Sequence, residues 1–268
     1  MPSTSLATIL ATAVAAQSIA LTRPARIRPE IDAYPRIAAP TVGPQQRINR
    51  ALDRLDSRLR TAMRECMGAP GDNPTSWKRQ IDAPMHGPEF VSYLITDEVD
   101  CGGAHPSTSH SAIVYDLRSG APVDWTVLLP RHLTGELGLA ERSGGVEVVT
   151  LTSARLFALY LAGYAHGAND TANDENCRDQ VAGPDDAAPV PMFAWLDARQ
   201  NGLVVQFDLN HANQACSEPV LIPAATLRHE GASARLLDAL AAAHASVARQ
   251  PSRNRAVGSD PRRVLRSK

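Results

Sequence analysis

The stretch from Cys101 to Pro106 narrows the choice of fold more than any other part of the sequence. It reads Cys-Gly-Gly-Ala-His-Pro, and runs rich in Val, Ile and Tyr lie on both sides of it. Two adjacent glycines allow backbone conformations that few other residues tolerate, so they favour a tight turn. The pattern therefore predicts two antiparallel strands joined at this turn, with His105 at its tip.

The strand pattern continues over residues 89–124 and predicts an antiparallel meander. Its last turn is expected at 118–120, where Arg-Ser-Gly leads into a short strand at 122–125. Further along the chain, Asn201-Gly202 is a strong turn signal between two apolar runs and predicts a hairpin. The predicted strands of this second region are 193–196, 202–209 and 220–223.

Three segments have apolar residues spaced by three and four, which predicts amphipathic helices. These segments are 44–67, 151–164 and 234–249. Pro44 suits a first helical turn, where a missing N–H costs nothing. We interpret the arginines of 44–67 as the solvated side of the helix; the alternative is a nucleic-acid patch. The fold class predicted is α+β, an antiparallel β-meander packed by two to three amphipathic helices in a single domain.

The ends of the chain differ from its middle. Residues 1–20 carry no charged side chain and contain an apolar run followed by small residues, which predicts a signal peptide, although an N-terminal helix of a cytosolic protein is the alternative. The run is too short to span a bilayer, and no later segment qualifies. We predict a linker at 21–33, the domain at 34–249 and a disordered basic tail at 250–268. The expected location is periplasmic or secreted.

The chain has four cysteines, Cys66, Cys101, Cys177 and Cys216. An even number at wide spacing fits two disulfides in an oxidising compartment, whereas four reduced thiols would fit a cytosolic protein. Four cysteines allow three connectivities. We favour Cys66–Cys101 with Cys177–Cys216, because this pairing keeps each bridge within one half of the fold.

Histidines and carboxylates cluster around the predicted turn. The candidate ligand-binding residues there are Asp97, Asp100, Gly102, Gly103, His105 and His110. On adjacent strands such a cluster can supply metal ligands or a general base, but its spacing matches no known metal site, and a His105 that only fixes the loop is the simpler interpretation. The sequence has no serine-hydrolase elbow and no phosphate loop, so no catalytic residue, metal or cofactor is predicted.

Charge is unevenly distributed along the chain. The stretch 168–186 has six acidic side chains against Arg178, so it is expected to steer a basic partner or gather divalent cations, unless it serves only solubility. Aromatic residues are 4% of the chain and are not interleaved with basic ones, which argues against nucleic-acid binding.

Short motifs resemble those of a known family. They are Tyr34-Pro35-Arg36-Ile37, Ile48-Asn49, Ser92-Tyr93, Gly102-Gly103-Ala104-His105-Pro106, Tyr115-Asp116-Leu117-Arg118-Ser119-Gly120 and the closing segments 204–209, 210–216 and 220–223. Their order resembles the extracytoplasmic domain of RsiV-type anti-sigma factors, which also accompanies some bacterial peptidoglycan deacetylases. The likeness covers about residues 34–230.

This resemblance implies an α+β extracytoplasmic domain, and the anti-sigma members bind lysozyme. The sequence shows neither a membrane-spanning helix nor a sigma-binding segment or deacetylase module, so those activities are not carried over. We expect a non-catalytic exported binding domain whose partner is a lysozyme-like protein or a peptidoglycan fragment. The alternatives are a small exported hydrolase, metal-dependent or not, that uses the His105 region, and a structural envelope protein. The oligomeric state stays open.

Overall fold

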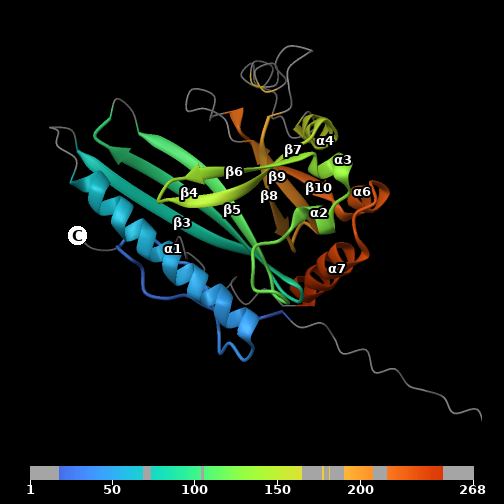
Figure 1. Cartoon of the computed structure of the whole chain (residues 1–268), viewed down its shortest axis with the longest axis horizontal. Helices are drawn as coiled ribbons and strands as arrows, with labels where there is room; N and C mark the ends of the chain where they lie inside the picture. Colours follow the sequence, from blue (N-terminus) through green and yellow to red (C-terminus); the bar gives the residue numbers. More distant parts are fainter. Residues whose placement is uncertain are drawn as a thin grey trace, which may run out of the picture.

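The computed structural model of the chain describes residues 18–68, 74–103, 106–164, 177, 181, 190–207 and 216–249 (Figure 1). The strands are β1 (Leu21–Thr22), β2 (Arg36–Ile37), β3 (Thr75–His86), β4 (Phe90–Cys101), β5 (Ser107–Asp116), β6 (Glu136–Arg142), β7 (Val146–Thr152), β8 (Met192–Asp197), β9 (Gly202–Phe207) and β10 (Val220–Pro223). The helices are α1 (Gly43–Met67), α2 (Trp125–Leu128), α3 (Arg131–Thr134), α4 (Ala154–Tyr164), α6 (Ala224–His229) and α7 (Ala234–Arg249). The chain is an α+β domain with antiparallel sheets and several helices, as predicted.

Strands β3, β4 and β5 form a three-stranded antiparallel sheet with α1 lying along one face (Figure 1). Ile48 and Leu52, from the apolar stripe of α1, are fully buried in a core shared with Tyr93 and Ile113 of the sheet. Pro44 lies in the first turn of the helix. The helix predicted at 44–67 is therefore confirmed.

A five-stranded antiparallel sheet, in the order β10-β9-β8-β7-β6, forms the second half of the domain. Every residue of β8 and β9 is buried, and α4, α6 and α7 contribute Tyr160, Leu227 and Leu240 to the same core. The two sheets meet where the Leu196 N–H donates to Ser92 Oγ over 3.1 Å. Asn201 has a φ of 52° at the turn between β8 and β9, so the predicted hairpin is confirmed.

Two hairpins in the structure, β3–β4 and β6–β7, differ from the prediction. Strand β3 was not predicted, because Arg79 and Pro84 interrupt its apolar alternation. The β6–β7 hairpin was also missed, and the helix predicted at 151–164 begins only at Ala154. Ser153 sets this boundary, since its Oγ accepts a hydrogen bond from the Leu156 N–H as an N-cap does. The short strand predicted at 122–125 is wrong beyond Pro122, because Trp125 opens α2.

The segment 21–33, predicted as a linker, packs against the folded body. Strand β1 pairs with β2, and Ile31 is buried. The Arg79 N–H donates to the Glu30 carbonyl and the Asp32 N–H donates to the Arg79 carbonyl, each over 3.0 Å. These bonds satisfy backbone groups at the edge of β3. Left unpaired, such groups could pair with a strand of another chain. The predicted signal peptide at 1–20 lies outside the described residues except for 18–20, and the predicted tail at 250–268 lies wholly outside them.

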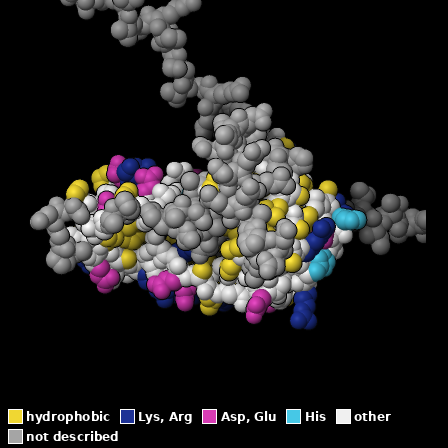
Figure 2. All heavy atoms as spheres, turned by 90° about the horizontal axis from the view of Figure 1, so that it is seen from above, with side chains coloured by type: hydrophobic (Ala, Val, Ile, Leu, Met, Phe, Trp, Pro, Cys, Tyr) yellow, Lys and Arg dark blue, Asp and Glu magenta, His cyan; other side chains and the backbone are white. Residues whose placement is uncertain are grey.

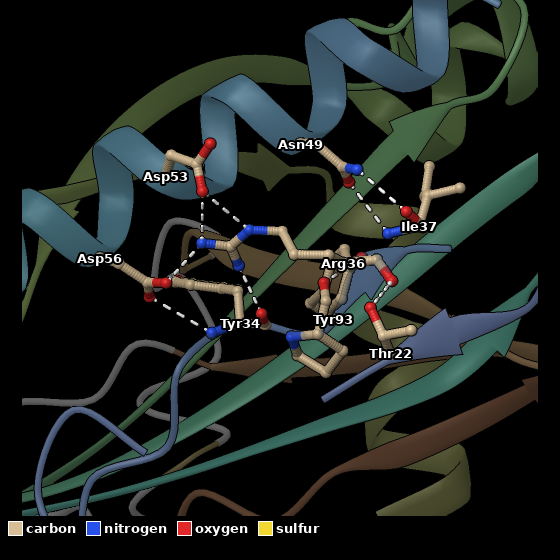
Figure 3. Close-up of polar contacts among 9 residues, drawn as sticks. Thr22, Tyr34, Arg36, Ile37, Asn49, Asp53, Asp56 and Tyr93 are labelled. Carbon is tan, nitrogen blue, oxygen red and sulfur yellow. Dashed lines mark hydrogen bonds and ion pairs between the residues drawn. The ribbon is translucent and has the colours of Figure 1, made fainter. Parts of the chain in front are cut away.

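The Tyr-Pro-Arg-Ile motif is held by α1 (Figure 3). Arg36 bonds Asp53 at 2.9 Å and Asp56 at 2.5 Å, and it also donates to the Tyr34 carbonyl. The Asn49 side-chain amide accepts from the Ile37 N–H and donates to the Ile37 carbonyl, as a neighbouring strand would. This motif therefore joins the N-terminal segment to the main helix.

Two disulfides close the fold, and both are the pairs favoured from the sequence. Cys66–Cys101 ties the end of α1 to the end of β4, and Cys177–Cys216 joins residues 39 positions apart.

Within the described part of the chain, none of the helices is long and apolar enough to cross a membrane.

The Tyr-Asp-Leu-Arg-Ser-Gly motif is tied to α7 by a four-residue ion-pair cluster. Arg235 bonds Asp116 at 2.6 Å and Glu89 at 2.8 Å, and Arg118 bonds Glu89 at 2.6 Å. Burial alone would raise the pKa of Glu89 and of Asp116, but hydrogen bonds from the arginines outweigh it, so both carboxyl pKa values lie below their ordinary range.

Replacing Arg235 with leucine is expected to lower the free energy of unfolding by about 1 to 2 kcal/mol at pH 7. Because the folded-state pKa values of both carboxyls are depressed, their contribution is present above about pH 4 and is lost as the pH falls through the folded values. Thermal melts of both proteins from pH 7 to pH 3 test this. We expect the gap in stability to shrink towards pH 3, and a gap that is independent of pH contradicts the account.

Candidate binding groove

The structure describes five of the six residues predicted around the turn, and two of these, Asp97 and His110, lie on opposite faces of the sheet. Asp97 is 1% exposed and forms a buried ion pair with Arg79, with Oδ2 to Nη2 at 2.6 Å. Trp77 Nε1 and Arg79 Nε both donate to Asp97 Oδ1, at 2.9 and 2.7 Å. With its oxygens occupied in this way, Asp97 serves as the counterion of Arg79.

His110 lies on the opposite face of the sheet from Asp97. It pairs in register with Thr96, and the Thr96 Oγ1 to His110 Nδ1 distance is 3.2 Å. Burial lowers the pKa of His110. The negative charge of Asp97 acts in the opposite direction, but its effect is smaller. Paired residues share a face and neighbours along a strand alternate, so Asp97 and His110 point to opposite sides.

The other predicted site residues lie at the tip of the β4–β5 hairpin. Asp100 Oδ1 accepts a hydrogen bond from the Gly102 N–H over 3.0 Å, and a Cβ added to Gly103 would meet no other atom within 4 Å. His105 lies outside the described residues. Among the residues that the structure describes, no three His, Cys, Asp or Glu side chains are grouped to hold a metal ion.

A groove instead runs along the face of β3 and β4 that is turned away from α1. Alternation buries Trp77, Arg79 and Ile81 against the helix side, and it leaves Lys78, Gln80 and Asp82 on the other face. In the pairing register, Lys78 lies opposite Glu98 and Gln80 opposite Thr96. The floor of the groove is therefore a row of polar strand residues.

The first part of the groove is a charged hollow of about 400 Å³. The N-terminal segment forms its outer wall with Arg23, Arg26, Glu30 and Asp32. Arg26 is held by Asp32 at 3.0 Å, and Lys78 meets Glu98 at 3.2 Å. Both basic and acidic groups therefore line this hollow.

The second part is a larger hollow of about 660 Å³ that shares Arg23 and Asp82 with the first. Its far wall is the β8–β9 turn, with Asp197, Arg199 and Gln200. Asp197 accepts hydrogen bonds from the Gln200 backbone and side chain, at 2.9 and 3.1 Å, and the Ala198 N–H donates to the Pro84 carbonyl over 3.1 Å. The turn is thus fixed against β3. Apolar side chains complete the hollow; they are Leu21, Pro35, Ala83, Pro84, Leu94, Trp195, Val204, Pro219 and Leu221.

The groove offers binding groups of both charges beside an apolar stretch. Arg23 and Arg199 are exposed, and Asp82 lines the same hollow. His86, in the same wall, has its Nδ1 at 2.8 Å from the Ile19 carbonyl. The described surface seen from above also shows acidic and basic side chains interspersed (Figure 2). Such an arrangement suits a ligand that carries both amines and carboxylates, since charge-assisted bonds of both signs are available.

The groove residues were missed because three segments far apart in sequence build the site. The period-two pattern of 75–82 is a weak signal that would have placed Lys78, Gln80 and Asp82 on one face. By contrast, no local pattern points to Arg23 or Arg199. Their position depends on the packing of the N-terminal segment and of the β8–β9 turn around the same sheet.

Comparisons with known proteins give a structural match and no sequence match. No protein-family model matches the chain, and no curated protein matches it. A DUF3298 family protein from Pseudomonas aeruginosa PAO1 is 16% identical, with a TM-score of 0.45, over 71% of this chain and 80% of that chain. A DUF3298 family member from Bacteroides fragilis NCTC 9343 is 15% identical, with a TM-score of 0.43, over 72% of this chain and 69% of that chain. Both matches are at low identity and are to proteins of the DUF3298 family, which is the RsiV-like domain family.

Proposed function

We propose that this chain is a non-catalytic binding domain that acts outside the cytoplasm and holds its ligand in the groove between the N-terminal segment and the β8–β9 turn. The observation that carries the proposal is the groove itself, a fixed surface with both charges and an apolar stretch. The two disulfides support the location, because such bonds persist in oxidising compartments.

A peptidoglycan fragment is the ligand class that we propose. The stem peptides of peptidoglycan carry free amines and carboxylates on short apolar residues, next to sugar hydroxyls. Asp82 and Glu98 suit the amines, and Arg23 and Arg199 suit the carboxylates. The apolar wall around Leu94 and Leu221 suits the alanine side chains.

A lysozyme-like protein is the other partner that the family resemblance implies. The acidic stretch 168–186, expected to steer such a basic partner, lies outside the described residues apart from Cys177 and Val181. Lysozyme is therefore titrated as a second ligand in the calorimetric experiment described next. Hydrolysis at the His105 region is not the function we propose, since Asp97 is already bonded to Arg79 and Trp77.

Calorimetric titration of the oxidised protein with a soluble disaccharide-tetrapeptide tests the proposal. Wild-type protein is expected to bind it, and the double variant Asp82→Ala/Arg199→Ala is expected to bind at least about tenfold more weakly, because tenfold corresponds to about 1.4 kcal/mol and two charged contacts are removed. The matched control is Asp238→Ala/Arg228→Ala, which removes the same charges from exposed sites on α7 and α6.

Each result has a definite meaning for the proposal. Binding that falls in the groove variant and stays within twofold in the control supports it. Absence of binding, an equal loss in both variants, binding of lysozyme alone, or release of cleaved fragments contradicts it.

A further inference from the structure

The exposed side of α1 carries a straight row of four arginines, Arg47, Arg50, Arg54 and Arg58. Intervals of three, four and four residues place them on one flank of the helix. All four are exposed. At 1.5 Å per residue the row extends about 16 Å along the helix axis. We call this set the arginine row.

None of the four makes an ion pair within the part of the chain that the structure describes. Arg47 donates through Nε and Nη2 to the Ser119 carbonyl, at 3.0 and 2.6 Å, and Arg58 donates to the Gly145 carbonyl at 3.3 Å. These contacts hold two guanidinium groups in place without neutralising them. Other arginines, such as Arg36 and Arg235, contact carboxylates. The positive charge of the row is therefore left for a ligand.

A hollow of about 450 Å³ lies beside the row, between α1 and the turn after β5. Arg47, Arg50 and Arg54 line one side, and Tyr115 and Pro122 line the other. Gly120 also lines the hollow and lies so close to the first turn of α1 that a Cβ there would overlap the Pro44 carbonyl oxygen. Charges beside a concave, partly apolar wall are less screened by solvent than charges on an open helix.

We propose that the arginine row binds an extended polymer with repeated phosphate groups. Four cations in a line match an extended polyanion, and the guanidinium fork matches a phosphate in geometry and charge. A single phosphate would meet only one or two of the arginines, so the row selects for a polymer. This surface is on the helix side of the sheet and is separate from the groove.

Binding of medium-chain inorganic polyphosphate by the full chain, measured by fluorescence anisotropy, tests the proposal. The variant Arg50→Gln/Arg54→Gln is expected to weaken binding at least about tenfold. The control Arg60→Gln/Arg64→Gln removes the same charge from the other flank of α1 and is expected to change affinity less than twofold. The logarithm of the dissociation constant should rise with the logarithm of salt concentration with a slope of about 3, since each of four contacts contributes about 0.7 to 0.9.

The remaining outcomes overturn the proposal. They are absence of polyphosphate binding, equal losses in both variants, equal binding of orthophosphate at the same phosphate concentration, and preference for an acidic peptide. Circular dichroism of both variants shows that α1 is intact. Because Arg50 and Arg54 lie outside the groove, these results do not depend on whether peptidoglycan fragments bind there.

Discussion

Replacing Asp97 with alanine is expected to lower the free energy of unfolding by about 3 to 5 kcal/mol, because the change leaves a buried cation without its partner. The side chains of Arg79 and Asp97 are 0% and 2% exposed, so water cannot solvate the remaining guanidinium. Trp77 also loses the acceptor for its indole N–H. Urea unfolding followed by circular dichroism measures the loss.

Two further variants test whether the loss of stability in Asp97→Ala comes from the broken ion pair. Asp100→Ala changes a carboxylate three residues away that serves only the hairpin turn, and it is expected to cost less than about 1 kcal/mol. Arg79→Met/Asp97→Leu replaces both charges with apolar groups, and it should recover much of the stability that the single variant loses. A loss below 1 kcal/mol in Asp97→Ala would show that this carboxylate is not held as a structural counterion.

Removing the Cys66–Cys101 disulfide is expected to cost about 3 to 4 kcal/mol. The bridge closes a loop between residues 35 positions apart, and the stabilisation by a disulfide grows slowly with the length of the loop that it closes. Guanidinium unfolding of Cys66→Ser/Cys101→Ser against the oxidised wild type measures it. The matching variant Cys177→Ser/Cys216→Ser, with a separation of 39, should lose a similar amount.

The disulfide result also bears on where the protein works. If both variants are nearly as stable as the oxidised protein, the bridges do not contribute to folding, and the argument for an oxidising compartment is weakened. A large loss in both means that the chain needs such a compartment to reach its full stability.

Much of the fold was predictable where the local pattern is strong. Helix α1 has a regular apolar stripe and a proline in its first turn, and the β8–β9 hairpin has Asn201-Gly202 between buried strands. Strand β3 was not predictable in the same way, since Arg79 is charged and yet buried. Its burial depends on Asp97, which lies 18 residues away in a different strand.

The site was harder to predict than the fold, for a physical reason. Proximity in sequence grouped Asp97 with His110, but strand alternation places them on opposite faces of the sheet. The groove depends on Arg23, Asp82 and Arg199, which only the tertiary structure brings to one surface. The β4–β5 hairpin is confirmed, whereas a binding role for the residues at its turn stays a prediction, because His105 lies outside the described residues.

The motifs that carry the family resemblance serve the fold where the structure describes them. Arg36 and Asn49 join the N-terminal segment to α1, and Asp116 joins the turn after β5 to α7. A resemblance built on such residues is informative about architecture. It leaves the ligand to be inferred from Asp82, Arg199 and their neighbours, which are not part of those motifs.

Chemical-shift mapping shows directly whether a peptidoglycan fragment binds in the groove. A disaccharide-tetrapeptide would be titrated into oxidised ¹⁵N-labelled protein, and the amides that move would be located on the structure. We predict that the largest changes fall on 78–82, 96–98 and 197–200, with none along the arginine row of α1. Saturable changes centred elsewhere, or no changes at millimolar ligand, would contradict the assignment of the groove as the binding site.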